Sequence, residues 1–269
     1  PNPASYAYTP GSSPLNCAKQ HSPCQWLIKI DIRQFFESIS EIQVYRVFRE
    51  LGYTSLVAFE LARLTTRVTH SEGRYKREPW QRHAKCESKI SAYHDTRIGY
   101  LPQGASTSPM LANLAMRKID EEITRLATSY YLTYTRYSDD LAFSSLSEDF
   151  SRDRARQFIK ELYKLVSQRG LRPNTVKTVI IPPGSRKIVL GLLVNTDTPK
   201  LTKEFRSKLE CHIYYLEKLG PTKHAEKRGF RTVLGLRRHI EGLVSYASSI
   251  DPQFGNAIAT RIAEVSWPI

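Results

Sequence analysis

The apolar residues of this chain fall into short runs and helical stripes. A mainly apolar run at 26–30, followed by Asp31, predicts a buried central strand over residues 25–31. Two further β-type runs, 132–137 and 141–144, flank a small polar turn and predict a hairpin. The other elements expected from spacing and end signals are short strands at 176–181 and 187–194 and helices at 36–51, 54–67, 109–126, 151–168, from Thr202 to Gly220-Pro221, and 230–248.

The order of these elements defines the expected fold class. A strand, a helix, a hairpin, a second helix and further strands form an α+β core, and the C-terminal part is helical. Residues 1–25 are rich in Pro, Ser and Gly, and residues 71–99 are polar, charged and without clear periodicity, so both are expected to be irregular. A chain of 269 residues can hold one large or two to three small structural units.

Acidic residues stand at two places where an expected strand ends. Asp31 closes the apolar run, and Asp139 and Asp140 occupy the hairpin turn. Carboxylates from two neighbouring strands can converge on divalent cations, the arrangement that polymerases use for phosphoryl transfer. Taken alone, an Asp-Asp pair is more often a solvated turn, and Asp31 alone could cap a helix.

A glycine-containing loop lies between these acidic segments. It runs from Gly99 through Gly104 into an expected helix, with Ser108 as the N-cap and Pro109 at the first helical position. The free N–H groups at such a helix start favour phosphate groups or a nucleic-acid backbone. Together with the acids, this loop indicates chemistry on phosphates.

Three motifs then occur in a diagnostic order. They are D-I-x-x-F-F from Asp31, L-P-Q-G-x-x-T-S-P from Leu101, and Y-x-D-D from Tyr137. In this order they resemble bacterial reverse transcriptases of the retron and defence-associated group. Residues 170–178 resemble the fourth palm motif of that family, residues 189–195 its primer-grip strand, and residues 242–246 its thumb, so the resemblance covers nearly the whole chain.

The resemblance implies a right-hand polymerase with a fingers remnant, a ferredoxin-like palm and a helical thumb. The implied division is fingers at 1–25 and 42–100, palm at 26–41 and 101–198, and thumb at 199–269. Family members place a basic strand pair before the first aspartate, and no such pair fits ahead of Ser13 in this chain, which begins at Pro1 without an initiator Met. An incomplete N-terminus of the fingers and disordered residues are two open interpretations of this difference.

The resemblance also implies site residues for RNA-directed DNA synthesis. The catalytic acids are Asp31, Asp139 and Asp140, and with the backbone carbonyl of Ile32 they are the implied ligands of two Mg²⁺ ions, for which Mn²⁺ can substitute. The implied nucleotide-binding residues are Ile32, Phe36, Gln103, Gly104 and Lys177, and the implied primer grip is Gly191 and Leu192. For Lys177, a role at the triphosphate and a plain surface lysine are equally open.

The charge of the chain indicates a polyanionic partner. The formal net charge is +14, and basic residues outnumber acids in 63–97 and 200–240, where aromatic residues are interleaved. The residues expected to contact nucleic acid are Arg74, Lys76 and Arg77 in the first cluster and Arg237 and Arg238 in the second. By resemblance, the partners are an RNA template (expected to be a structured non-coding RNA), a DNA primer or product, dNTPs and an effector protein.

Several alternatives remain open. Cys17 stands where retron enzymes carry the Asn of N-A-x-x-H, and Leu190 stands where they carry the Thr of V-T-G, so a different bacterial defence reverse transcriptase is an alternative to a retron enzyme. The further alternatives are a group II intron-type enzyme, an RNA-templated RNA polymerase and a non-catalytic nucleic-acid scaffold. Phe36 disfavours the RNA polymerase, which tends to carry a polar residue there, and the intact acids disfavour the scaffold.

The location expected from the sequence is cytoplasmic, without a membrane partner. No apolar run is long enough to span a bilayer, and no signal sequence is visible. The cysteines are scattered along the chain, which favours free thiols.

Overall fold

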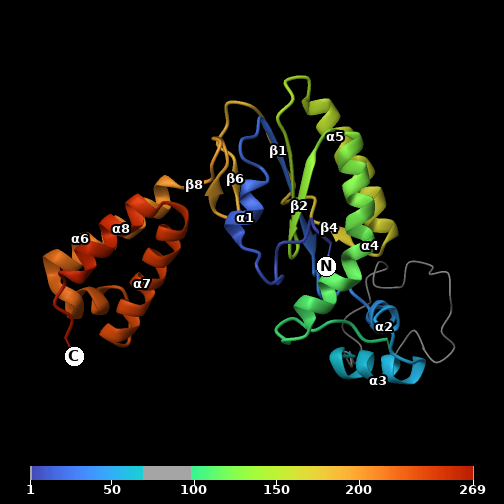
Figure 1. Ribbon diagram of the computed structural model, residues 1–269, viewed down its shortest axis with the longest axis horizontal. Coiled ribbons are helices and arrows are strands. Elements are labelled where there is room, and N and C mark those ends of the chain that lie inside the picture. Colours follow the sequence, from blue (N-terminus) through green and yellow to red (C-terminus); the bar gives the residue numbers. More distant parts are fainter. Residues whose placement is uncertain (1, 69–97, 269) are drawn as a thin grey trace. The chain divides into compact units, whose positions relative to one another are not determined.

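A computed structural model describes residues 2–68 and 98–268 of the chain (Figure 1). The chain divides into two compact units, Pro1–Lys187 and Ile188–Ile269. The predicted boundaries of fingers, palm and thumb are finer than this division and stay predictions.

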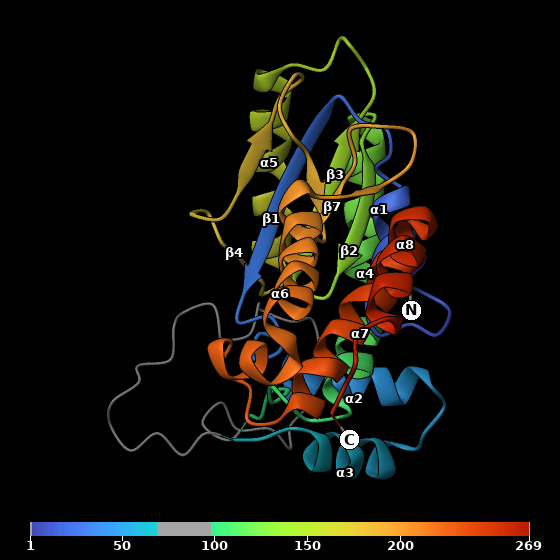
Figure 2. The same ribbon diagram turned by 90° about the vertical axis from the view of Figure 1, so that its left-hand side faces the viewer.

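The first unit is built on an antiparallel sheet. Its strands have the order β2-β3-β1-β4, and β5 also pairs with β1 (Figure 2). The strands are β1 (Trp26–Arg33), β2 (Thr133–Tyr137), β3 (Asp140–Ser145), β4 (Arg172–Pro173) and β5 (Val179–Ile181). Helix α4 (Ser108–Ser129) is the last helix between β1 and β2, and α5 (Arg152–Gln168) connects β3 to β4. This is the β-α-β-β-α-β order of a ferredoxin-like fold, which confirms the α+β palm predicted from the sequence.

The two faces of β1 have different environments. Ile28, Ile30 and Ile32 alternate along the strand and lie in the main apolar core with residues of α4 and α5. Figure 1 shows both helices on this face of the sheet, whereas the short helix α1 (Pro14–Lys19) lies against the other face. The positions between these isoleucines face the other side of the sheet. Asp31 is one of them, so its side chain points away from the main core.

Helix α2 (Glu41–Glu50) begins later than its apolar spacing predicts. Ser40 caps it with Gln43 in a reciprocal capping box, so residues 36–39 are turns and the predicted start at Phe36 was wrong. Helix α3 (Ser55–Thr65) lies within the predicted range 54–67.

Buried Glu41 joins α2 to the segment that precedes the glycine loop. Its carboxylate accepts a hydrogen bond from the Gly99 N–H at 2.8 Å and pairs with Arg63 at 3.2 Å. Next to it, Arg67 and Tyr100 exchange two backbone hydrogen bonds of 3.0 and 3.1 Å. The two ends of the segment 68–99 are therefore held together, and the loop from Leu101 onward starts from a fixed point.

The start of α4 also differs from the prediction. Thr107 is the N-cap, without a side-chain cap bond, and Ser108 is the first helical residue, whose hydroxyl donates to the Pro102 carbonyl at 2.7 Å. This bond closes the loop between Pro102 and Ser108. Helix α5 begins as predicted, with Ser151 as the side-chain cap, and Gly170 with φ +82° follows its end.

The second unit combines a small sheet with three long helices. Strands β6 (Ile188–Val189), β7 (Leu192–Leu193) and β8 (Lys200–Leu201) pair in sequence. The single strand predicted at 187–194 was wrong, because Leu190 and Gly191 have φ of +49° and +82° and form a two-residue hairpin turn. The strand predicted at 176–181 likewise forms only from Val179 onward.

The helices of the second unit are α6 (Lys203–Lys227), α7 (Val233–Ile250) and α8 (Pro252–Ala263). Thr202 caps α6 as predicted, and the helix is interrupted at Gly220, where the sequence predicted its end. Thr232 caps α7 slightly later than predicted. Helix α8, capped by Asp251, was not predicted. Among residues 2–68 and 98–268, no helix has the length and apolar character needed to cross a membrane.

His21 joins α1 to the sheet on the face opposite the main core. Its ring nitrogens lie 2.7 Å from both the Ser144 and the Thr135 hydroxyl oxygens, and the residue is 1% exposed. Burial lowers the pKa of His21 to about 4 from its ordinary 6.5. The neutral ring can donate to one hydroxyl and accept from the other, whereas the charged ring would place a desolvated positive charge between two neutral hydroxyls.

We expect the free energy of unfolding to fall as the pH drops below about 6.5. His21 of the unfolded chain then binds a proton, whereas His21 of the folded chain stays neutral until the pH approaches about 4. The loss from this residue between pH 7 and pH 5 is about 2 kcal/mol. Urea unfolding of wild type and His21→Gln at both pH values measures it, since glutamine can form hydrogen bonds but does not titrate. An equal pH effect in both proteins would contradict the assignment.

Candidate functional site

Asp31 and Asp140 lie directly opposite each other in the neighbouring strands β1 and β3. The Asp31 carbonyl accepts the Asn174 N–H at 2.7 Å on the other side of β1, so this pair is of the type not hydrogen-bonded to each other. Such pairs have their Cα atoms roughly 4.5 Å apart and their side chains close together on one face. The two carboxylates predicted to converge from neighbouring strands are thus adjacent.

Asp139 occupies the two-residue turn between β2 and β3. Its carbonyl accepts the Ile32 N–H at 3.1 Å, and the preceding Ser138 has φ +59°, a conformation suited to tight hairpins. In an antiparallel strand the carbonyl of a residue points to the same side as its N–H. The Ile32 carbonyl therefore points toward the turn that carries Asp139.

The other edge of β1 is interrupted beside Asp31. Strand β5 pairs with the first half of β1 and β4 with its last two residues, and the turn between them begins at Asn174. The Asn174 side-chain amide donates to Asp31 Oδ2 at 2.9 Å, and Lys177 Nζ lies 3.3 Å from Asp31 Oδ1. The Tyr163 hydroxyl of α5 donates to Thr178 Oγ1 at 2.6 Å and holds this turn in place.

The charges around the acids are partly balanced by lysines. Desolvation raises the pKa of Asp140, and the negative charges of Asp139 and Asp31 raise it further, whereas Lys29 and Lys177 lower it. Like charges placed opposite each other destabilise a sheet. The site thus favours a positive group close to the carboxylates.

The donor atoms at this site fit a hard divalent cation. Carboxylate and backbone carbonyl oxygens are typical ligands of Mg²⁺, which binds through one or two carboxylates together with waters and substrate phosphates. In the described part of the chain, no three or more His, Cys, Asp or Glu side chains are grouped so that they alone could hold a metal ion. An ion beside the Asp31–Asp140 pair would therefore need further oxygen ligands.

The remaining predicted nucleotide-binding residues lie on the first unit. Gln103 and Gly104 are exposed in the loop before α4, and Gly104 has φ +92°. Phe35 is 4% exposed and lies in the core, whereas Phe36 is partly buried against that core, with its ring centroid 5.5 Å from that of Phe35.

The other predicted site residues are distributed differently. Gly191 and Leu192 lie at the β6–β7 turn of the second unit. Arg237 and Arg238 lie on α7, where Arg237 pairs with Glu241 at 2.8 Å. Arg74, Lys76 and Arg77 lie outside the described residues.

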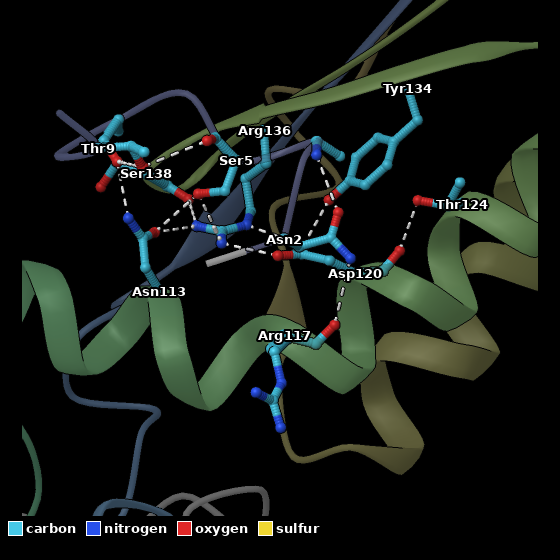
Figure 3. A network of polar contacts seen from close by, with 12 residues as sticks. Asn2, Ser5, Thr9, Asn113, Arg117, Asp120, Thr124, Tyr134, Arg136 and Ser138 are labelled. Atoms are coloured by element: carbon cyan, nitrogen blue, oxygen red, sulfur yellow. Dashed lines mark hydrogen bonds and ion pairs between the residues drawn. The ribbon is translucent and has the colours of Figure 1, made fainter. Parts of the chain in front are cut away.

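A buried polar network lies directly behind the turn (Figure 3). Arg136 of β2 and Asp120 of α4 are each 0% exposed and form a two-bond ion pair of 2.9 and 2.8 Å. The Tyr134 hydroxyl also donates to Asp120, at 2.9 Å, and burial together with the Asp120 charge raises the pKa of Tyr134 well above its usual value. Arg136 Nη1 donates to the Ser138 carbonyl at 3.1 Å, which connects this network to the turn.

Sequence reasoning missed two residues that contact the site backbone or the acids, Asn174 and Arg136. A signal existed for Arg136, because it alternates with Tyr134 along an expected strand, and an arginine on the buried face of a strand requires a buried acid. For Asn174 the sequence carries only a turn signal, since its contact with Asp31 joins positions far apart in the chain.

Comparison with known proteins identifies the family. Residues 2–192 match the family described as reverse transcriptase (RNA-dependent DNA polymerase), and the chain belongs to it. The chain is 28% identical over 264 residues to the retron Ec86 reverse transcriptase of Escherichia coli, covering 98% of this chain and 68% of that protein. It is 30% identical over 262 residues to the retron Mx65 reverse transcriptase of Myxococcus xanthus, covering 97% and 54%. The predicted resemblance to retron enzymes is thus confirmed.

Among solved structures, the chain is similar to telomerase from Candida albicans in complex with a fragment of telomeric RNA. The TM-score is 0.45 at 13% identity, and the match covers 96% of this chain and 46% of that one.

Reverse transcriptases generally use divalent metal ions, in agreement with the donor set around Asp31.

Proposed function

We propose that this chain is an RNA-directed DNA polymerase that copies an RNA template by two-metal nucleotidyl transfer. The observation that carries the proposal is the Asp31–Asp140 cross-strand pair beside the turn that bears Asp139. A primer 3′-hydroxyl attacks the α-phosphate of a dNTP and pyrophosphate leaves, so the protein mainly positions the reactants and balances charge. The retron relatives support this reading over an RNA polymerase or a scaffold.

Asp31, Asp139 and Asp140, together with the Ile32 carbonyl, would hold two Mg²⁺ ions. When bound, these ions supply a lower pKa for the attacking hydroxyl and charge stabilisation for the leaving group. Asn174 fixes one oxygen of Asp31, which leaves the other oriented toward Lys177. Lys177 offsets the carboxylate charge before substrate binds, and its exposed amine beside Asp31 would act on the triphosphate.

The other predicted residues take the roles of a right-hand polymerase. Gln103 and Gly104 contact the nucleotide and template, and Phe36 lies beneath the incoming sugar. Gly191 and Leu192 support the primer end. Residues 1–25 and 42–100 serve as fingers, 26–41 and 101–198 as palm, and 199–269 as thumb.

The biological template would be a structured non-coding RNA, and the setting an anti-phage defence system or retroelement with an effector protein. The similarity to retron enzymes over nearly the whole chain supports this role. A group II intron-type role is the alternative. Sequencing the nucleic acid that copurifies with the protein tests both, since a retron-type enzyme should carry DNA joined to or copied from one specific RNA.

We expect Asp31→Ala and Asp139→Asn to abolish primer extension while the fold is retained. Loss of a carboxylate that binds the metal ions removes several kcal/mol of transition-state stabilisation, about a thousandfold or more in rate. Asp153→Asn is the matched control, because the Asp153 side chain is 89% exposed on α5. Extension close to wild type by either active-site variant would refute the catalytic assignment.

Sugar selection gives a second test. A rigid ring at Phe36 should leave no space for a ribose 2′-hydroxyl, so Phe36→Val should admit ribonucleotides and keep some DNA synthesis. The measurement is kcat/KM for one dNTP divided by that for the matching NTP. Phe35→Leu changes the neighbouring core ring and should leave the ratio unchanged. An unmoved ratio in Phe36→Val, or equal use of both sugars by wild type, contradicts this role.

Nucleic-acid binding by α7 can be tested by salt dependence. Reversing the charges of Arg237 and Arg238 to Glu should lower the slope of log affinity for structured RNA against log salt by about one for each phosphate that is no longer neutralised. Arg156→Glu on α5 controls for net charge, because Arg156 is 66% exposed and already paired with Asp153. The assignment fails if the slope is unchanged, or if Arg156→Glu reduces it equally per charge.

A further inference from the structure

We propose that Arg136 is a positioning residue for the catalytic turn. We further propose that the N-terminal segment around Ser5 belongs to the same hydrogen-bonded network. This inference rests on the proposed function, because it assigns the turn of residues 137–140 to catalysis. Its basis is the set of hydrogen bonds that joins the turn, helix α4 and the N-terminal segment behind the acids (Figure 3).

The first observation is the burial of a complete ion pair. Arg136 and Asp120 are both 0% exposed, within the first unit. A buried ion pair generally adds no net stability over well-packed apolar residues, because desolvation offsets the attraction between the charges. The value of this pair therefore lies in the geometry that it fixes.

The second observation is that every guanidinium nitrogen has a defined partner. Nε and Nη2 donate to the two Asp120 oxygens, and Nη2 also donates to Ser5 Oγ at 3.1 Å. Nη1 donates to Asn113 Oδ1 at 3.0 Å and to the Ser138 carbonyl at 3.1 Å. With Asp120 and Asn113 both on α4, the rigid guanidinium plane sets the position of the Ser138 carbonyl relative to that helix.

The third observation concerns the backbone on both sides of Asp139. The Ser138 carbonyl is held by Arg136, and the Asp139 carbonyl is held by the Ile32 N–H. Ser138 has φ +59°, which non-glycine residues adopt only when their surroundings impose it. Arg136 thus supplies a restraint that keeps the proposed metal-binding Asp139 in place.

The fourth observation extends this hydrogen-bonded network to the N-terminal segment. The Arg136 N–H donates to the Ala4 carbonyl at 2.8 Å, and the Tyr6 N–H donates to the Arg136 carbonyl at 2.9 Å, so Ser5 pairs with Arg136 as a parallel bridge beyond β2. Ser5 Oγ also donates to Asn113 Oδ1 at 3.0 Å. The segment that closes the edge of β2 therefore supplies a side chain to the network behind the turn.

Arg136→Lys and Ser5→Ala test the proposal. Lysine keeps the charge beside Asp120 but loses the planar donors, so kcat for primer extension should fall about a hundredfold while KM for dNTP changes less than about threefold. Ser5→Ala removes one hydrogen-bonding group and should reduce kcat about tenfold. The matched control is Tyr134→Phe, which removes a hydrogen bond to the same Asp120 and leaves all Arg136 donors in place.

Hydrogen exchange of the Ile32 amide supplies a readout that needs no catalysis, because this amide reports on the Asp139 carbonyl. We expect faster exchange in Arg136→Lys and Ser5→Ala and wild-type exchange in Tyr134→Phe. Wild-type exchange and kcat in Arg136→Lys would overturn the inference. So would a loss of kcat in Tyr134→Phe equal to that in Arg136→Lys, because the network would then act only through stability.

The two hypotheses can fail separately. A wild type that does not extend a primer would refute the proposed function, while the exchange contrast would still support the role of Arg136 in holding the turn. An active wild type with equal Ile32 exchange in all variants would refute the inference alone.

Discussion

The buried ion pair between Arg136 and Asp120 is the interaction on which the geometry of the first unit depends. It joins the strand before the turn that carries Asp139 to the helix that crosses behind the sheet. Both charges are removed from water, so each must keep its partner or destabilise the fold by several kcal/mol. Because the guanidinium is planar and its nitrogens are all engaged, the pair specifies an orientation as well as a distance. The N-terminal segment, α4 and the hairpin are thereby fixed together.

The acids lie where the regular pairing of the sheet stops. Strand β3 begins at Asp140, and the turn at Asn174 interrupts the ladder on the other edge of β1 beside Asp31. A continuous sheet would use its backbone groups internally and would separate like charges. Here two carboxylates face each other, and Lys177 and Asn174 engage one of them. The site thus accepts local electrostatic strain that a bound cation would relieve, while the apolar face of β1 keeps the strand in register.

The sequence predicts those parts of the structure whose signals are local. The central strand, the hairpin and α5 follow from apolar periodicity and caps such as Ser151. Helix α2 was predicted too long because apolar spacing continues ahead of the cap at Ser40, where the helix begins. The turn at Leu190 could not be read from the sequence, because leucine rarely takes a positive φ. The hydrogen bonds of Arg136 and Asn174 join residues distant in the chain, so only the fold reveals them. Motif resemblance supplied the roles of the acids, and periodicity alone left a solvated turn as the alternative.

The backbone pairing of Arg67 with Tyr100 has a consequence for how the chain can vary. Because the two residues exchange hydrogen bonds, the chain that leaves at one returns at the other. Glu41 reinforces this point by holding Gly99 against α2 and α3. Insertions, deletions or sequence drift between these two anchors leave the position of Leu101 and the following loop unchanged, since closing a longer loop adds little entropy. The starting point of the loop that carries Gln103 and Gly104 is thus set by this pairing and not by the length of chain between the two anchors.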